Sequence, residues 1–339
     1  MTKNNLLIAI KKRVTAYMNR RPHRSFRRTR RRDIDRSLKL PGYWAFTAHV
    51  GKTLWAHRKT FVLLAVVYAV LTALLVGIAS QDTYSILTDT LRTTGANVFI
   101  GEWGEVGQAS LLFAATVTGS ISQTLTDVQQ VYATLIALLA WLTTIWLLRN
   151  ILAGHKVKLR DGLYNAGSPI LSTFLVALLL LVQILPFALA LIGYSVASAT
   201  GLLTAGGVES MLFWIAAGLL TVLSFYLITS TTFALVIVTL PGMRPFQAIK
   251  TAGDLVIGRR LRILMRLLWL AISLAVIWTI IMIPMILIDM WLKGLWPVIS
   301  WVPTIPMVLL ALSSLTIVWV SSYVYLLYRK VVADDANPA

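Results

Sequence analysis

Six long runs of apolar residues constrain the fold of this chain more than any other feature. They cover residues 61–78, 131–148, 170–192, 212–240, 263–288 and 302–327 of the 339 in the sequence. A helix that rises 1.5 Å per residue needs about 20 apolar residues to cross a bilayer core of about 30 Å. No run has a charged residue in its central part, whereas the surface helices of soluble proteins keep one polar face. The sequence therefore predicts an all-α integral membrane protein with six transmembrane helices.

The positions of the basic residues predict how these helices are oriented. When the N-terminus is placed in the cytoplasm, 29 of the 31 Lys and Arg residues fall in cytoplasmic segments, and only Arg92 and Lys293 fall outside. Cytoplasmic loops of membrane proteins carry such an excess of Lys and Arg. We therefore expect a multi-pass protein of the plasma (inner) membrane with both termini in the cytoplasm.

The chain divides into three parts by charge and hydropathy. We expect a basic cytoplasmic tail at residues 1–42, a six-span membrane domain at 43–330 and a short cytoplasmic tail at 331–339. The formal net charge is +18, and over half of the Lys and Arg residues precede the first span. So large a positive charge needs an anionic partner or an anionic surface.

The first tail combines an apolar helix face with an arginine-rich stretch. The apolar face consists of Leu6, Ile10, Val14 and Tyr17, and it predicts an amphipathic helix in the lipid headgroups. Contacts with anionic phospholipids, each contributing about 1 kcal/mol, are predicted for Arg20, Arg21, Arg24, Arg27, Arg28, Arg30, Arg31 and Arg32. The alternative partner is nucleic acid, with Phe26 as a stacking group. One aromatic residue gives this alternative less support than the lipid surface has.

A short amphipathic segment leads directly into a span three times along the chain. These repeats begin at Ala48, Leu163 and Ala248. Apolar side chains on such a segment suit a membrane interface, and neighbouring basic residues stay in water while the chain turns into the bilayer. We therefore expect three helical hairpins, each preceded by a cytoplasmic interfacial helix.

The third repeat shows this pattern most clearly. Residues 245–258 carry an apolar face made of Phe246, Ile249, Gly253 and Val256, which predicts a helix lying flat with this face in lipid. A basic elbow follows, and contacts with anionic lipid are predicted for Arg259, Arg260 and Arg262.

The loop between the first two spans, residues 79–130, is the longest one expected on the outer side. Apolar residues repeat at helical spacing in its last part, residues 108–130. This spacing fits an outer helix that leads into the second span and equally a segment that dips into the outer leaflet. Both alternatives stay open.

The stretch at residues 241–264, PGMRPFQAIKTAGDLVIGRRLRIL, carries a resemblance to a known family. Its order of span end, Pro turn, small-residue helix, basic elbow and new span resembles the six-span membrane domain of glycerophosphodiester phosphodiesterase membrane-domain proteins and related small bacterial inner-membrane proteins. The resemblance covers about residues 43–329 and implies a lipid-associated membrane module. In enzymes of that name a separate soluble barrel performs the chemistry, and this chain has no room for one.

Residues that carry catalytic or metal chemistry are sparse. The absence of Cys excludes disulfides and cysteine nucleophiles. Glu102 and Glu105 are the only close pair of carboxylates expected outside, and a metal site needs more ligands than two. No phosphate-binding Gly loop, HExxH or GxSxG motif is present. We therefore expect no enzymatic activity, no metal and no cofactor.

Neutral polar residues are the remaining candidates within the spans. A polar cavity for a lipid headgroup or small solute would use Gln183, Ser224, Thr229, Ser230, Ser313 and Ser314. The alternative is that these residues bond to their own helices and allow close helix packing. Ion-coupled transporters carry intramembrane charges, and these spans have none in their central parts.

The sequence favours a membrane module that interacts with lipid or with a partner membrane protein. The alternative is a passive or partner-driven permease subunit for an amphipathic solute or lipid.

Overall fold

The computed structural model describes residues 40–76, 127–203, 207–296 and 302–336. This part of the chain forms nine α-helices and contains no strand. Six of the helices are long and apolar enough to cross a membrane: α3 (Arg58–Leu75), α6 (Asp127–Leu152), α8 (Ile170–Ala199), α9 (Val208–Ile237), α11 (Arg260–Leu295) and α12 (Thr304–Ala336). The prediction of an all-α chain with six helices that can span a membrane is thereby confirmed for the described residues.

The other three helices are short, and each precedes a span. They are α2 (Tyr43–Ala56), α7 (Leu159–Asn165) and α10 (Pro245–Val256). The last begins at Pro245, where a proline ring already has helical geometry, and Gln247 Oε1 accepts a hydrogen bond from the backbone amide of Arg244 at 3.4 Å. The helix ends before Gly258, whose φ of 76° is a conformation that favours glycine. The helix α10 lies within the predicted segment 245–258, and α2 overlaps the repeat predicted to begin at Ala48. The helix α7 begins four residues before the repeat predicted at Leu163.

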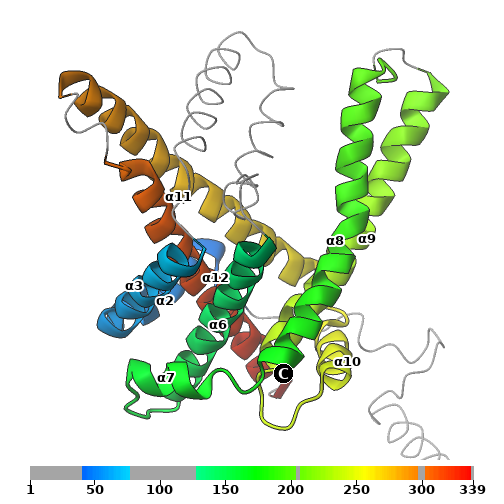
Figure 1. Ribbon diagram of the computed structural model, residues 1–339. Coiled ribbons are helices and arrows are strands. Elements are labelled where there is room, and N and C mark those ends of the chain that lie inside the picture. The colour runs from blue at the N-terminus through cyan, green and yellow to red at the C-terminus, as the bar shows by residue number, and fades with distance from the viewer. Residues whose placement is uncertain (1–39, 77–126, 204–206, 297–301, 337–339) are drawn as a thin grey trace, which may run out of the picture.

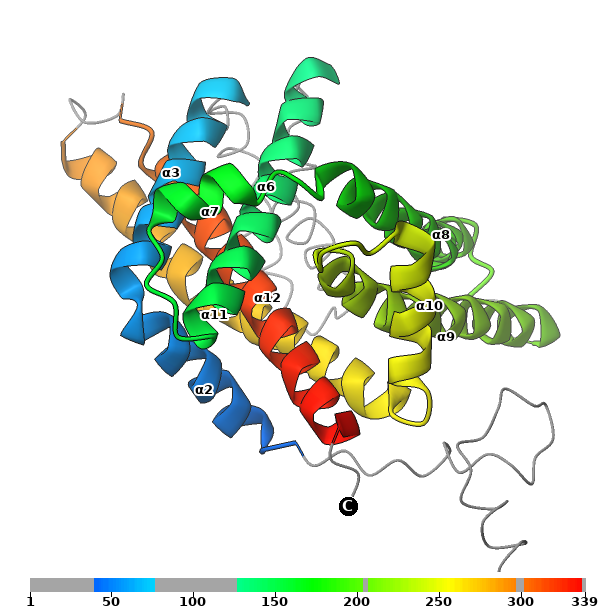
Figure 2. The same cartoon turned by 90° about the horizontal axis from the view of Figure 1, so that it is seen from below.

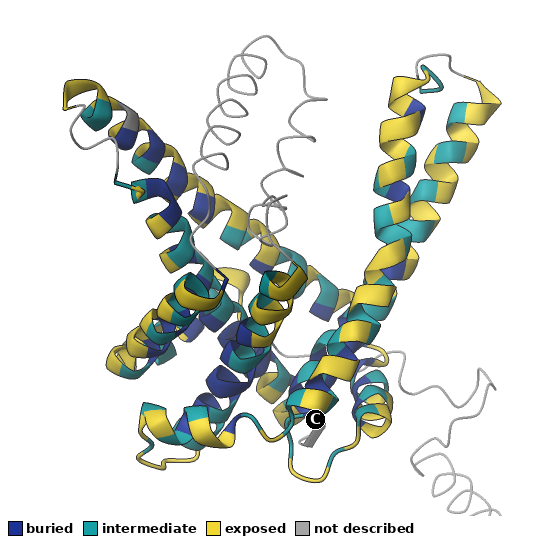
Figure 3. Ribbon diagram, in the orientation of Figure 1, coloured by how far each residue is buried: buried dark blue, intermediate teal, exposed yellow. Residues whose placement is uncertain are grey.

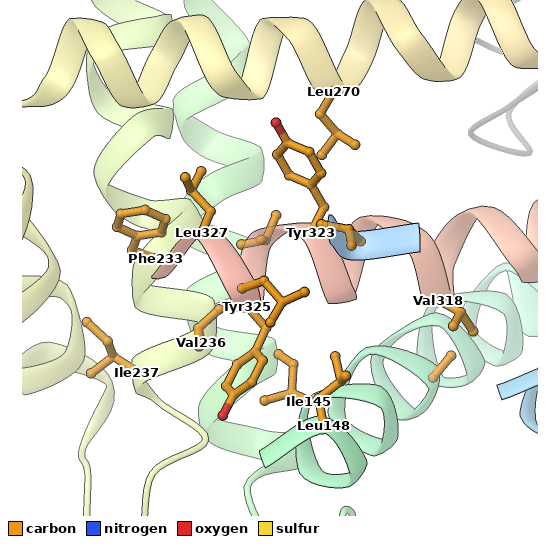
Figure 4. Close-up of a cluster of buried hydrophobic side chains, with 14 of the residues drawn as sticks. Ile145, Leu148, Phe233, Val236, Ile237, Leu270, Val318, Tyr323, Tyr325 and Leu327 are labelled. Carbon is orange, nitrogen blue, oxygen red and sulfur yellow. The ribbon is translucent and has the colours of Figure 1, made fainter. Parts of the chain in front are cut away.

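One hydrophobic core joins the six long helices at one end. It takes side chains from α3 along its length, from the N-terminal parts of α8 and α11, from the C-terminal halves of α6, α9 and α12, and from α2 and α10. Figure 4 shows residues of this core, including Leu148 of α6, Phe233 of α9, and Tyr323 and Leu327 of α12. We call this end of the spans, with α2, α7 and α10, the core side, and the opposite ends the far side.

The central element of the core side is α12. It contacts α2, α3, α6, α9, α10 and α11, and Figure 2 shows it running through the middle of the helices. With 33 residues it is about 50 Å long, which exceeds a bilayer core of about 30 Å. Its last turns can therefore reach beyond the hydrocarbon while remaining packed, as the buried side chain of Val331 shows.

The far side is more open. The far parts of α8 and α9 stay together as a pair and rise away from α11 and α12 (Figure 1). Most of their residues are exposed or half-buried (Figure 3). A second, smaller cluster holds α11 to α12 there through Trp278, Met282, Ile286, Ile305 and Leu312.

Polar side chains tie several helices together. The hydroxyls of Tyr68 in α3 and Thr143 in α6 lie 2.8 Å apart in a buried hydrogen bond. Trp278 Nε1 of α11 donates to Thr316 Oγ1 of α12 at 2.9 Å. Such bonds matter between spans because lipid chains are as apolar as the side chains, so burial alone does not hold helices together.

Candidate functional site

The three arginines of the predicted basic elbow have three different environments. Arg259 is only 4% exposed, and its Nη2 lies 2.9 Å from Asp334 Oδ2 in α12. Arg260 stacks on Tyr226, with its Cζ 3.8 Å from the ring centroid, and donates from Nη1 to the Tyr226 carbonyl at 3.1 Å. Arg262 is exposed.

The prediction that Arg259 contacts anionic lipid is therefore replaced by a structural role. A buried guanidinium is stable only when it is paired, and the carboxylate of Asp334 supplies the opposite charge. The pair joins the start of α11 to the end of α12. Arg260 and Arg262 remain the residues of the elbow with surface available for lipid.

Arg266 is a second buried arginine, which the sequence had marked only as a cytoplasmic charge. It donates from Nη2 to the Pro41 carbonyl, and its Cζ lies 4.2 Å from the ring centroid of Tyr43. Cation–π stacking over an aromatic ring stabilises a guanidinium away from water. Arg266 thus connects the start of α2 to α11. Its position just inside the apolar run at residues 263–288 is the signal that could have marked it, because a charge inside a span needs a partner.

The buried face of α10 differs from the predicted one. Ala248, Ala252 and Val256 are fully buried in the core, whereas Phe246 is 87% exposed and Ile249 is half-buried. Small alanine side chains allow two helices to approach closely. The predicted face is therefore wrong for Val256, which packs on protein, while Phe246 points to the surroundings.

The neutral polar residues of the spans bond mainly to their own helices. Thr229, Ser230, Ser313 and Ser314 each donate to a carbonyl three or four residues earlier. This is the behaviour expected from the close-packing alternative. The predicted cavity formed by the six residues stays a prediction.

Ser224 differs, because it donates across to another helix. Its hydroxyl donates to the backbone carbonyl of Gln183 in α8 at 2.6 Å. Pro186 lies within α8 and provides no amide to the turn before it. Side chains of neighbouring helices commonly satisfy the backbone groups near such a proline in a membrane, so Ser224 contributes to the α8–α9 pairing.

A cavity of about 390 Å³ lies on the core side, where the end of α6 meets the α7–α8 turn and the α9–α10 turn. Its polar lining includes Arg149 of α6, Asn165, Ser168 and Ser172 around the α7–α8 turn, and Thr239 after α9. None of the six residues predicted to form a polar cavity lines it. Sequence reasoning missed this site because the lining comes from three segments far apart in the chain.

Arg149 gives the cavity a positive charge. It donates from Nη1 to the Thr239 carbonyl at 3.2 Å, which uses one of the five N–H donors of a guanidinium. No Asp or Glu is among the described residues that line the cavity. The Asn165 amide is turned to its own helix, where it donates to the Asp161 carbonyl at 2.8 Å.

Aromatic and basic side chains gather on the surface of the short helices. Trp44 and Trp55 of α2, Tyr164 of α7 and Phe246 of α10 are all strongly exposed. Arg58 Cζ lies 5.2 Å from the Trp55 ring centroid. Exposed basic residues near them are Lys52, Arg58, Lys59, Lys158, Arg160, Lys250 and Arg262. This combination is typical of segments at the boundary between lipid and water.

The tail arginines predicted to contact anionic lipid, from Arg20 to Arg32, lie outside the described residues, and so does the loop at residues 79–126.

Comparison of the chain with protein-family models, with curated proteins and with solved structures found no significant match. Function is therefore inferred from the exposed aromatic and basic side chains of the core side and from the cavity at Arg149.

Proposed function

We propose that this chain is a multi-pass protein of the plasma (inner) membrane whose core side faces the cytoplasm and binds anionic phospholipids. It acts as a membrane module for lipid, or for a partner membrane protein, and has no catalytic activity of its own. The main support for the proposal is the surface of α2, α7 and α10, where exposed aromatic rings lie among exposed Lys and Arg residues.

The distribution of charge between the two sides supports this orientation. All the exposed basic residues named above belong to the core side. At the far ends of the described helices the charged residues are Asp127, Glu209, Asp289 and Lys293, and Lys293 Nζ lies 2.9 Å from Asp289 Oδ2. Positive charge on the cytoplasmic side and its depletion on the other is the usual asymmetry of membrane proteins.

The packing supports three hairpins and cytoplasmic termini. The helices α3 and α6, α8 and α9, and α11 and α12 contact each other as pairs. Each pair brings the start of its first helix and the end of its second helix into the common core. The first and last described residues, 40 and 336, therefore lie on the side with the basic residues, which supports cytoplasmic termini. The resemblance of residues 241–264 to six-span lipid-associated domains agrees with this role.

Lipid selectivity of the full-length protein tests the proposal. The protein is placed in nanodiscs made of mixed phosphatidylglycerol and phosphatidylcholine, and the lipids retained after dilution into neutral detergent are counted by mass spectrometry. We expect enrichment of phosphatidylglycerol that falls at high salt, because exposed charges are screened over about 10 Å at 0.1 M ionic strength. Retention in the same ratio as the starting mixture would contradict the proposal.

A further inference from the structure

We propose that the cavity between α6, the α7–α8 turn and the α9–α10 turn is a binding site for a phosphate group, with Arg149 as its cationic ligand. This inference rests on the proposed function, because the headgroup of an anionic phospholipid is one source of such a phosphate. A free phosphate is the other source, and the two sources share the chemistry that the site recognises.

The size of the cavity suits a headgroup. Ligand pockets of proteins enclose about 300–1,000 Å³, and this cavity measures about 390 Å³. A phosphate with a glycerol attached fits within that volume, whereas two complete acyl chains do not. Trp146, Leu240 and Met243 form an apolar part of the lining, which suits the carbon atoms next to a phosphate.

The charge of the cavity selects an anion. Arg149 is half-buried, so its charge is less screened than that of an exposed arginine. Its bond to the Thr239 carbonyl fixes the guanidinium and leaves most of its N–H donors for a ligand. A guanidinium can bind two phosphate oxygens at once through its planar fork.

Ser168 and Ser172 provide further donors. Within the described part of the chain neither hydroxyl has a hydrogen-bond partner, and both residues line the cavity together with Arg149. The Ser172 backbone amide lies in the first turn of the 30-residue α8, where amides have no partner in their own helix. Together the guanidinium, the two hydroxyls and this amide can donate hydrogen bonds to several oxygens of one phosphate.

The site differs from the exposed basic surface in what it requires. A surface charge attracts every anionic headgroup and is replaceable by any neighbouring charge. A cavity requires one particular guanidinium and enough empty space. Two variants test these requirements: Arg149→Gln removes the charge but keeps a donor for the Thr239 carbonyl, and Ser172→Leu keeps the charge but removes one hydroxyl and fills the space.

The test measures binding to the full-length protein in neutral detergent by titration calorimetry. The probes are dihexanoyl phosphatidylglycerol, inorganic phosphate and dihexanoyl glycerol, which has the same chains without phosphate. We expect Arg149→Gln and Ser172→Leu each to weaken phosphatidylglycerol binding at least tenfold, which equals about 1.4 kcal/mol. The matched control is Lys330→Gln, which removes one exposed charge outside the cavity and should change the affinity less than twofold.

The three probes show whether the cavity binds phosphate and whether that phosphate belongs to a lipid. Binding of phosphatidylglycerol alone identifies a lipid site, and binding of inorganic phosphate with the same dependence on Arg149 identifies phosphate as sufficient. Equal binding of dihexanoyl glycerol, or equal affinities of wild type and both cavity variants, would overturn the inference. If Arg149→Gln does not fold, as a lowered melting temperature would show, Ser172→Leu carries the test alone.

The same measurements separate this inference from the proposed function. Nanodisc selectivity for phosphatidylglycerol that persists unchanged in both cavity variants would remove the cavity site and leave the surface role. Arg149-dependent binding of inorganic phosphate without lipid selectivity would leave the cavity site and remove the lipid role.

Discussion

The core side and the far side of the six spans differ in how they are packed. On the core side, Tyr323, Leu327 and Val331 of α12 are buried among neighbouring helices. On the far side, the paired α8 and α9 expose large apolar side chains such as Trp214, which is 57% exposed, and Leu219, which is 66% exposed. The most apolar window of α6 is 44% buried and that of α9 only 6%. The two helices have similar hydropathy but very different burial. Hydropathy therefore locates a span but does not show how much of its surface contacts protein.

The same two sides differ in polar contacts. The core side holds two buried arginines, Arg259 and Arg266, which connect α11 to α12 and α11 to α2. On the far side Asp289 is buried and forms an ion pair within α11, and Thr304 of α12 donates to it. Since apolar surfaces gain little by leaving lipid for protein, we expect the core side to carry most of the stability of the fold.

Breaking the Arg259–Asp334 pair should give the largest effect. Removing one partner of a buried ion pair costs about 3–5 kcal/mol, so Arg259→Gln is expected to lower the free energy of unfolding by about 3 kcal/mol, and Asp334→Asn should act in the same direction. The matched control Arg262→Gln concerns an exposed arginine three residues later and should change stability by less than about 0.5 kcal/mol. Unfolding in mixed micelles measures these differences, and equal effects at the two arginines would contradict a structural role for Arg259.

Truncating leucines on the two sides sharpens the packing comparison. Leu327 is fully buried at the centre of the core, and Leu→Ala changes in protein cores cost about 2–5 kcal/mol. We expect Leu327→Ala to cost about 2 kcal/mol and Leu219→Ala, on the exposed face of α9, to cost less than about 0.5 kcal/mol. The same unfolding assay measures both. A larger loss at Leu219 would show that the α8–α9 pair is packed against protein on a face that is open here.

A pair of glycines tests close packing at the short helices. In α7 a Cβ added at Gly162 would lie 3.0 Å from side-chain atoms of Leu147 in α6, whereas one added at Gly253 in α10 meets nothing within 4 Å. Overpacking costs about 1–3 kcal/mol, so we expect Gly162→Ala to destabilise by about 1 kcal/mol. Gly253→Ala should be neutral or stabilising by about 0.5 kcal/mol, because alanine favours helix. Melting temperatures in detergent compare the two, and a more harmful Gly253→Ala would mean that α10 has a neighbour on that face.

Much of this architecture follows from local sequence. Span positions depend on runs of apolar residues, and the start of α10 depends on Pro245 with its neighbours Arg244 and Gln247. Its end depends on Gly258. These signals act within a few residues of the structure they specify, so no knowledge of the tertiary fold is needed to read them.

The rest depends on partners that are distant in the chain. The sequence could not show that Arg259 would meet Asp334, which lies at the end of the last helix. It also could not tell which apolar face of α10 meets lipid and which meets protein, because Phe246 and Ala248 are both apolar. The cavity at Arg149 was missed for the same reason, since Ser172 and Thr239 reach it from other segments.

Single-cysteine labelling in intact cells tests the central claim, that the core side faces the cytoplasm. The chain has no Cys, so Val208→Cys at the far end of α9 and Ala333→Cys at the core-side end of α12 each provide one reactive thiol at an exposed position. We predict that a membrane-impermeant maleimide labels Val208→Cys in intact cells and labels Ala333→Cys only after permeabilisation. Labelling of Ala333→Cys from outside, with Val208→Cys protected, would contradict the account.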